Sequence, residues 1–578
     1  MRCTGLGVGA FLLFAFTGWL APPLSAADPA KVLQAQLEAG EFAPAIGMAQ
    51  QAANPQQRDA WLAQIATAQA RSGERRASLA TASEIDGDLL RSDTLRQMSE
   101  PSPRAGTRNG GNRGGGPQAD FDSLIDLITS TVAPTTWDAV GGPGSIAPFA
   151  TGVYVDAGGL MHRLLQDDST GRLNRLRQTA SVEPSDGSVR HKSVLRKVSL
   201  PRLERAVQLR LAAGEDLDDE MRALAGLQRI NYVLVYPETG DIVLAGPAGD
   251  WQADREGRLV SVEGGKPVMQ LDDLVVVLRL MLDKPNATFG CAIKPTQEAL
   301  ARTKAYIEES NKNPLKPGQR DSWLAKLRGS LGAQEIEYYD LDPRTRAAHV
   351  LVEADYRMKL VGIGLEEGSL DVPSYLARIN VPKGQAAPSL GVLRWWFALN
   401  YQSLLASGDR QAFEFRGTGV KVLSENELLT ETGQRVHTRQ SEPINEAFAH
   451  DFTKHFDALA AKYPIYGELR NIFDLALASA LIKSENLPSR VNWRLTCFSD
   501  PKQYAVELGY APQTVETVIN HKTVNRTQIV AAVSGGVFVD PKELVNRNAI
   551  ETDRTGKVES HHARSIPQKL PRSQWWWD

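Results

Sequence analysis

A segment too rich in glycine and proline to build a core divides this chain into two parts of different composition. Residues 101–118 read PSPRAGTRNGGNRGGGPQ and hold few apolar side chains, so we expect a flexible linker at residues 100–119. The sequence before it is rich in alanine and glutamine, whereas the sequence after it mixes strand and helix patterns. The chain therefore predicts an α+β protein built in separate parts.

The first residues predict the compartment. Arg2 supplies a positive charge, residues 8–20 are apolar, and residues 24–27 offer small side chains to a signal peptidase. The apolar run is shorter than the roughly 20 residues that span a bilayer. We therefore expect a cleaved signal peptide at residues 1–27 and an exported mature chain, periplasmic or extracellular, without a transmembrane anchor.

Composition and motifs argue against several classes of function. The net charge is -3 and the isoelectric point is near 6.4, so we expect no nucleic-acid partner. His450 and His455 lie five residues apart and do not share a helix face, and no CxxC, HExxH, complete P-loop or GxSxG motif occurs. We therefore predict no metal site and no cofactor.

Residues 28–99 predict a helical segment. A Gly-Glu step at residues 40–41 recurs at residues 73–74, close to the tetratricopeptide period of about 34 residues. Two interpretations stay open, a tetratricopeptide-like pair of helical hairpins that contacts other proteins and a plain alanine-rich bundle.

Residues 120–150 follow the linker and predict a docking helix that ends in a glycine turn. Phe121, Leu124, Ile125 and Ile128 recur at helical spacing, and Gly-Gly-Pro-Gly at residues 141–144 predicts a tight turn. Trp137, between the two, is a predicted contact residue.

We divide the rest of the chain into three α+β domains, residues 151–285, 286–390 and 391–548, and a polar tail, residues 549–578. The clearest hairpin is expected at residues 231–246. In the second domain we expect a strand, helix, strand and strand at residues 287–293, 296–310, 334–339 and 347–352, then a helix from residue 354, an order compatible with a ferredoxin-like unit. Ser534-Gly535-Gly536 fits a hairpin turn.

Several of these segments carry a resemblance to known proteins. The motifs FGCAIKP, EADYRMKLVGIGLE, RWWFALNY and KYPIYGELRNIFDLALASALI resemble a planctomycete exported family of unknown function, over about residues 194–545. Residues 120–149 resemble a segment of planctomycete secretin-like proteins. The family has no established activity, so the resemblance implies export but assigns no catalytic residue.

The densest group of ionisable residues lies in the motif EADYRMK. Glu353 or Asp355 could act as a base, with Arg357 or Lys359 orienting an anionic group. The alternative, which we favour, is the first turn of a helix with an Asp355–Lys359 pair at i, i+4 spacing. These four residues are the catalytic candidates.

Tryptophans and cysteines supply the remaining predicted contacts. Trp395 and Trp396 are adjacent on a predicted strand, so we expect one in the core and the other available for binding. Trp575, Trp576 and Trp577 either fold back onto the body, which we favour, or bind a partner. Two thiols remain after signal cleavage, and either they form a disulfide or each is buried alone. These are Cys291 and Cys497.

We predict from these patterns a non-catalytic binding or scaffold protein of the cell envelope with a protein partner. One alternative is an extracytoplasmic hydrolase whose site the sequence does not identify. Another is an accessory component of a secretion assembly, which the resemblance of residues 120–149 implies.

Overall fold

The computed structural model describes residues 29–39, 42–52, 54–72, 74–99, 145–149, 152–156, 162–164, 189–254, 256–284, 286–312, 318–369, 371–380, 390–430, 434–524, 527–567, 570–571 and 573–578. The chain forms two compact units, Met1–Pro103 and Arg104–Asp578. The predicted signal peptide, the linker, the docking helix and Trp137 lie outside the described residues.

The N-terminal unit is helical, as predicted. Its long helix α3 begins after Asn54, whose side chain accepts a hydrogen bond from the Gln56 amide, and packs against α2, α4 and α5. The buried Asp59 carboxylate accepts from the amides of Asp86 and Gly87 and fixes the turn before α5. The tetratricopeptide-like repeat stays a prediction. The helices are α1 (Pro29–Ala39), α2 (Phe42–Gln50), α3 (Pro55–Arg71), α4 (Arg75–Ser83) and α5 (Asp88–Ser99).

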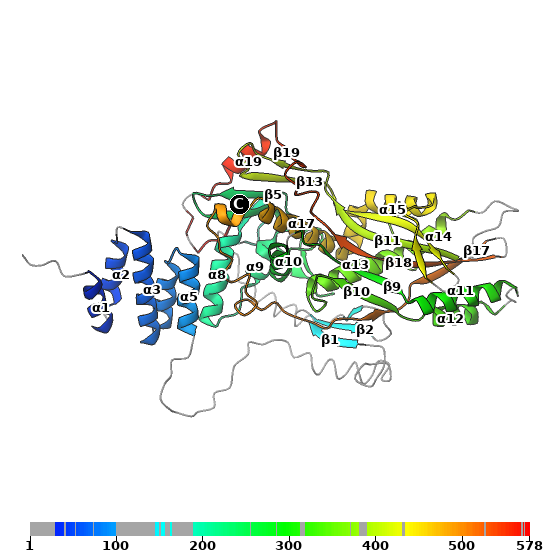
Figure 1. Cartoon of the computed structure of the whole chain (residues 1–578), viewed down its shortest axis with the longest axis horizontal. Coiled ribbons are helices and arrows are strands. Elements are labelled where there is room, and N and C mark those ends of the chain that lie inside the picture. The colour runs from blue at the N-terminus through cyan, green and yellow to red at the C-terminus, as the bar shows by residue number, and fades with distance from the viewer. Residues whose placement is uncertain are drawn as a thin grey trace, which may run out of the picture. The chain divides into compact units, whose positions relative to one another are not determined.

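The larger unit is a mixed α+β body, as predicted (Figure 1). Its largest sheet runs in the order β15-β14-β11-β18-β9-β10-β16, with β17 paired to β18. Strands from both sides of the expected domain boundary at residue 390 join this sheet. Its strands are β9 (Phe289–Pro295), β10 (Gln334–Tyr339), β11 (Leu390–Asn400), β14 (Gly419–Leu429), β15 (Arg435–His437), β16 (Thr514–Val515), β17 (Ile519–Val524) and β18 (Thr527–Val539).

A second sheet has the order β19-β12-β13-β5-β6-β4-β20. Its β5 and β6 form the antiparallel hairpin expected at residues 231–246. Its strands are β4 (Ser193–Ser199), β5 (Tyr232–Tyr236), β6 (Asp241–Ala248), β12 (Ser403–Ala406), β13 (Ala412–Arg416), β19 (Ile550–Thr552) and β20 (Trp576–Trp577). Two small sheets are β1 (Ser145–Phe149) with β2 (Gly152–Asp156) and β3 (His162–Leu164), and β7 (Trp251–Ala253) with β8 (Leu259–Ser261).

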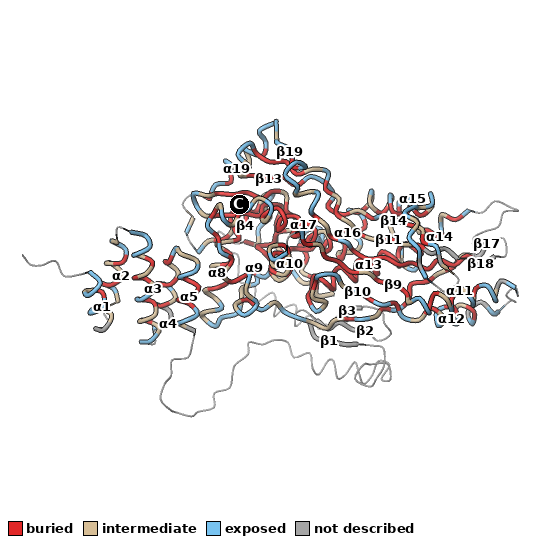
Figure 2. The backbone as a smooth tube through the Cα atoms, in the orientation of Figure 1, coloured by how far each residue is buried: buried red, intermediate tan, exposed pale blue. Residues whose placement is uncertain are grey.

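Two almost fully buried helices hold the body together (Figure 2). Helix α13 (Arg346–Ile363) packs on β18, β9 and β11, and α17 (Pro464–Ser484) packs on α13 and on α10 (Leu271–Asp283). Among the described residues, no helix has the length and hydropathy needed to cross a membrane. The other helices are α8 (Leu200–Ala213), α9 (Asp219–Arg222), α11 (Gln297–Lys312), α12 (Arg320–Leu331), α14 (Tyr375–Arg378), α15 (Pro443–Lys454), α16 (Phe456–Lys462), α18 (Leu487–Arg490) and α19 (Lys557–Arg564), with a 3-10 turn at Leu224–Gly226.

The prediction of a strand at residues 347–352 is wrong, because these residues form the first turns of α13. Thr345 caps the helix by accepting from the Ala348 amide, and the apolar run is buried on all sides, where periodicity does not separate strand from helix. In residues 286–390, β9, α11 and β10 lie where the sequence predicts them. The second of the two consecutive strands in the expected ferredoxin-like order is replaced by the start of α13.

The prediction of a hairpin turn at Ser534-Gly535-Gly536 is also wrong. The three residues continue β18, and the glycines serve close backbone contact instead of a turn. A Cβ atom at Gly535 would lie 1.9 Å from the Trp395 carbonyl oxygen, and one at Gly536 would lie 2.0 Å from that of Cys291. Both neighbours are strand backbone, so only glycine fits.

The C-terminal tryptophans fold back onto the body. Trp576 and Trp577 form β20, which pairs with the edge strand β4, and the side chains of Trp575 and Trp577 are 6% and 8% exposed. The buried Arg196 guanidinium donates to the Asp578 carboxylate and lies 4.8 Å from the Trp576 ring centre. The favoured interpretation of the tail is confirmed, and the edge of β4 is covered.

Candidate functional site

The four ionisable residues of EADYRMK do not converge on one point. The motif lies inside α13 and not at its start, which corrects the expected first turn. Asp355 and Lys359 face the sheet, Glu353 pairs with Arg258, and Arg357 stacks over the Tyr463 ring at 4.9 Å. These four side chains therefore do not line a shared catalytic cleft.

The predicted Asp355–Lys359 pair is present and is buried completely. Lys359 Nζ lies 2.7 Å from Asp355 Oδ2 and also donates to the Ile293 carbonyl at 3.2 Å, and neither side chain is exposed. Burial raises the pKa of Asp355, and the Lys359 ammonium opposes that shift. Lys359 thus ties α13 to β9, and Gly535 of β18 lies directly against both side chains.

Glu353 belongs to a second buried network that joins three helices. Arg258 donates to Glu353 and Glu468, and Arg346 donates to Glu468 and Asp273. Burial raises the pKa of Asp273 to about 6, although the Arg346 guanidinium opposes the shift. Helices α10, α13 and α17 are thus held together by charge as well as by apolar packing.

The two cysteines are free and buried, which is the second of the two alternatives. Burial raises the pKa of both thiols well above the usual value, so they remain protonated. Neither Cys291 nor Cys497 has the exposed, electropositive surroundings of a reactive thiol.

The adjacent tryptophans occupy opposite sides of β11, as predicted. Trp395 is fully buried and donates from Nε1 to the Asn445 Oδ1 atom at 2.5 Å. Trp396 is half-buried on the other side, with the Arg394 guanidinium 4.5 Å from its ring centre. Only Trp396 is available for contact with another molecule.

Trp396 is part of a sheet surface on which several side chains are exposed. Leu423, Trp396, Gly536, Ala292 and Glu337 are cross-strand neighbours in one row over five strands. In the next row, Phe538 and Tyr339 both neighbour Gly290. Alternation along each strand places these residues opposite α13. We call this set the open face: Gly290, Ala292, Glu337, Tyr339, Trp396, Leu423, Gly536 and Phe538.

The open face combines exposed apolar side chains with two buried glycines. Phe538, Tyr339 and Leu423 are 46%, 38% and 36% exposed. Gly290 lies between Phe538 and Tyr339, and Gly536 lies beside Trp396; both glycines are buried by their neighbours. Phe538 and Tyr339 stand on strands two apart, about 10 Å from each other. The sequence indicated Trp396 but missed Phe538 and Tyr339, since only the strand register brings them together.

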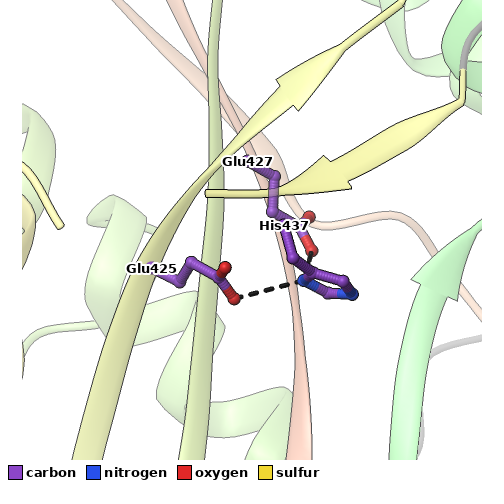
Figure 3. A group of neighbouring side chains, drawn as sticks. All are labelled: Glu425, Glu427 and His437. Atoms are coloured by element: carbon purple, nitrogen blue, oxygen red, sulfur yellow. Dashed lines mark hydrogen bonds and ion pairs between the residues drawn. The ribbon is translucent and has the colours of Figure 1, made fainter. Parts of the chain in front are cut away.

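Two buried glutamates and a histidine lie at one end of this side of the sheet (Figure 3). Glu425 and Glu427 are two residues apart on β14, and His437 is the cross-strand neighbour of Glu427 on β15. His437 Nδ1 lies 3.2 Å from Glu425 Oε2 and 3.3 Å from Glu427 Oε1. No motif in the sequence pointed to this group. An acidic pair at i, i+2 spacing before a short hairpin was its only local signal.

Arg394 connects the group to the open face, because it donates to Glu425 at 3.1 Å and stacks on Trp396. Burial alone would raise the pKa of Glu425, but the Arg439 amide, Arg394 and His437 hold it below its usual value. Glu425 is therefore an ionised carboxylate in an almost fully covered position.

Comparison with known proteins identifies one segment of the body. Residues 291–375 match a family described as protein of unknown function (DUF1598). This span includes β10, α13 and most of β9. It therefore holds the Asp355–Lys359 pair and three residues of the open face, Ala292, Glu337 and Tyr339. No curated protein and no solved structure matches the chain.

Proposed function

We propose that this chain is an exported, non-catalytic binding protein of the cell envelope that holds a protein partner on the open face. The observation that carries the proposal is the exposure of Phe538 and Tyr339, on either side of Gly290, on a sheet whose other side is packed. Exposed aromatic side chains gathered on one surface are typical of interaction sites.

The charges around the open face favour a protein over a polyanion. Lys294 forms an ion pair with Glu337, and Arg394 forms one with Glu425. The positive charge of each of these two side chains is therefore balanced by a carboxylate. Aromatic and arginine side chains in a polar, charge-balanced surround are the common composition of protein–protein interfaces. A nucleic-acid site would need an excess of positive charge.

The compartment is part of the proposal and rests on the sequence. The short positive segment, the apolar run at residues 8–20 and the small residues at 24–27 support export. The resemblance to a planctomycete exported family supports the same location. A role as an accessory component of a secretion assembly rests on the resemblance of residues 120–149 and is a narrower form of this proposal.

Site-specific photocrosslinking in the exporting cells tests the function. A photoreactive phenylalanine analogue replaces Phe538 or Tyr339 on the open face, and Val262 or Leu508 at exposed control positions elsewhere, which are 49% and 48% exposed. We expect a single crosslinked product, of the same molecular mass from positions 538 and 339, and no product from the two control positions. Adducts from all four positions, from the controls alone or from none of them would contradict the proposal. An adduct of twice the chain mass would identify a second copy in place of another protein.

A further inference from the structure

We propose that Glu425, Glu427 and His437 bind one divalent transition-metal ion, with zinc as the best fit. Their potential ligand atoms all lie within 4.8 Å of one another. Carboxylate oxygens and imidazole nitrogens are zinc ligands, and three protein ligands with solvent at the fourth position are the arrangement of an open zinc site. This inference is independent of the partner proposed for the open face.

Two of the three separations between donor atoms, those from the histidine nitrogen, fit a tetrahedral ion, and the third is within 4.8 Å. Ligand atoms held at 2.0–2.1 Å from zinc in a tetrahedron are about 3.3–3.4 Å apart. His437 Nδ1 lies 3.2 Å from the Glu425 oxygen and 3.3 Å from the Glu427 oxygen. Small movements of these side chains therefore suffice to admit the ion.

Neighbouring donors orient both carboxylates toward the histidine. The Arg439 amide donates to Glu425 Oε1 at 2.7 Å, which leaves Oε2 directed at His437 and Arg394. The Ser534 hydroxyl donates to Glu427 Oε2 at 3.2 Å, while Oε1 faces His437. Hydrogen bonds to the outer oxygens of metal-binding carboxylates are the usual support of such sites.

Charge and access also favour a cation here. The side chains of Glu425 and Glu427 are 6% and 0% exposed, so two carboxylates share a covered site with Arg394 as a guanidinium partner of Glu425. Like charges in such a position repel strongly, and a divalent ion neutralises both. His437 is 54% exposed and provides the side from which the ion and a solvent ligand enter. The imidazole favours zinc, copper, iron or nickel over calcium, which prefers oxygen donors.

Titration calorimetry of the untagged mature chain, stripped with chelator and then given zinc chloride, tests this inference. We expect one zinc ion per chain. Glu427→Gln keeps the shape of the side chain and its contact with Ser534, and His437→Ala removes an exposed ligand. Each is expected to weaken zinc binding by at least about tenfold. His450→Ala is the matched control, because His450 Nδ1 lies 3.2 Å from one carboxylate, that of Asp451, at an exposed position; it is expected to leave zinc binding unchanged.

Thermal unfolding with and without zinc gives a readout that does not depend on calorimetry. Zinc is expected to raise the melting temperature of the wild type and of His450→Ala but not that of His437→Ala. Circular dichroism establishes that each variant is folded. The assignment would be overturned if the wild type did not bind zinc, or if Glu427→Gln and His437→Ala bound zinc as tightly as the wild type. Tighter binding of calcium than of zinc would also overturn it.

Discussion

The Nζ atom of Lys359 lies 2.7 Å from the Oδ2 atom of Asp355, and neither side chain has exposed surface. A pair buried this deeply stabilises the fold only while both charges are present, because a single buried charge left alone is expensive. The residues that looked most like a catalytic group in the sequence therefore hold α13 against the sheet.

The first prediction concerns this pair. Lys359→Met should lower the free energy of unfolding by about 3–5 kcal/mol, because Asp355 is left as an uncompensated buried charge. The double variant Asp355→Leu, Lys359→Met should be more stable than Lys359→Met, since no charge remains. Urea denaturation measures both. Lys284→Met, which breaks an exposed pair with Asp340, should cost less than about 1 kcal/mol. A double variant less stable than Lys359→Met would contradict this account of the pair.

The second prediction concerns pH and Asp273. The folded-state pKa is about 6, above the usual 3.8, so the folded protein retains a proton that the unfolded chain loses between these values. Stability contributed by this group should therefore fall as pH rises from 4 to 6, by about 1.4 kcal/mol per pH unit. Unfolding free energies at pH 4, 5 and 6 for the wild type and Asp273→Asn measure the difference in slope. Equal slopes in the two proteins would mean that Asp273 does not titrate in this range.

The third prediction concerns the C-terminal tryptophans. Trp575→Ala should destabilise the body by about 3–5 kcal/mol, because its ring fills the core. Trp576→Ala is the control, since its ring is only half-buried and stacks on the Arg196 guanidinium, and this substitution should cost about 1 kcal/mol or less. Deletion of residues 575–578 should lower the melting temperature further, because the edge of β4 is uncovered. A truncated chain with wild-type stability would show that the tail is not part of the fold.

The fourth prediction separates the adjacent tryptophans on β11. Trp395→Ala should cost about 3–5 kcal/mol, since it empties a core position and leaves Asn445 without its donor. Trp396→Ala should change stability by about 1 kcal/mol or less but should weaken partner binding. Gly362→Ala should destabilise like Trp395→Ala, because the new Cβ would lie 2.1 Å from the Trp395 ring. Differential scanning calorimetry of the three variants makes the comparison.

Local patterns in the sequence predicted what neighbouring residues determine. Alternation along a strand placed Trp395 inside and Trp396 outside, helical spacing paired Asp355 with Lys359, and turn residues marked the hairpin of β5 and β6. Each of these depends on residues a few positions apart, so no knowledge of the tertiary fold was needed.

The errors and omissions arose where distant segments decide the structure. Residues 347–352 are buried on all sides by segments far away in the sequence, so their apolar pattern did not reveal the helix. Gly535 continues a strand because the backbone of Trp395 lies against it. His437 joins Glu425 and Glu427 only through the pairing of β14 with β15. The open face likewise exists only in the register of strands from three separated regions of the chain.

The yield of the photocrosslink from position 538 in cells, compared between chains with Trp396 and with Trp396→Ala, tests the central claim most directly. If the open face holds a protein partner, the yield should fall at least about tenfold in the Trp396→Ala chain while its melting temperature stays close to that of the parent. An unchanged yield from a folded Trp396→Ala chain would contradict the claim that this face is the binding site.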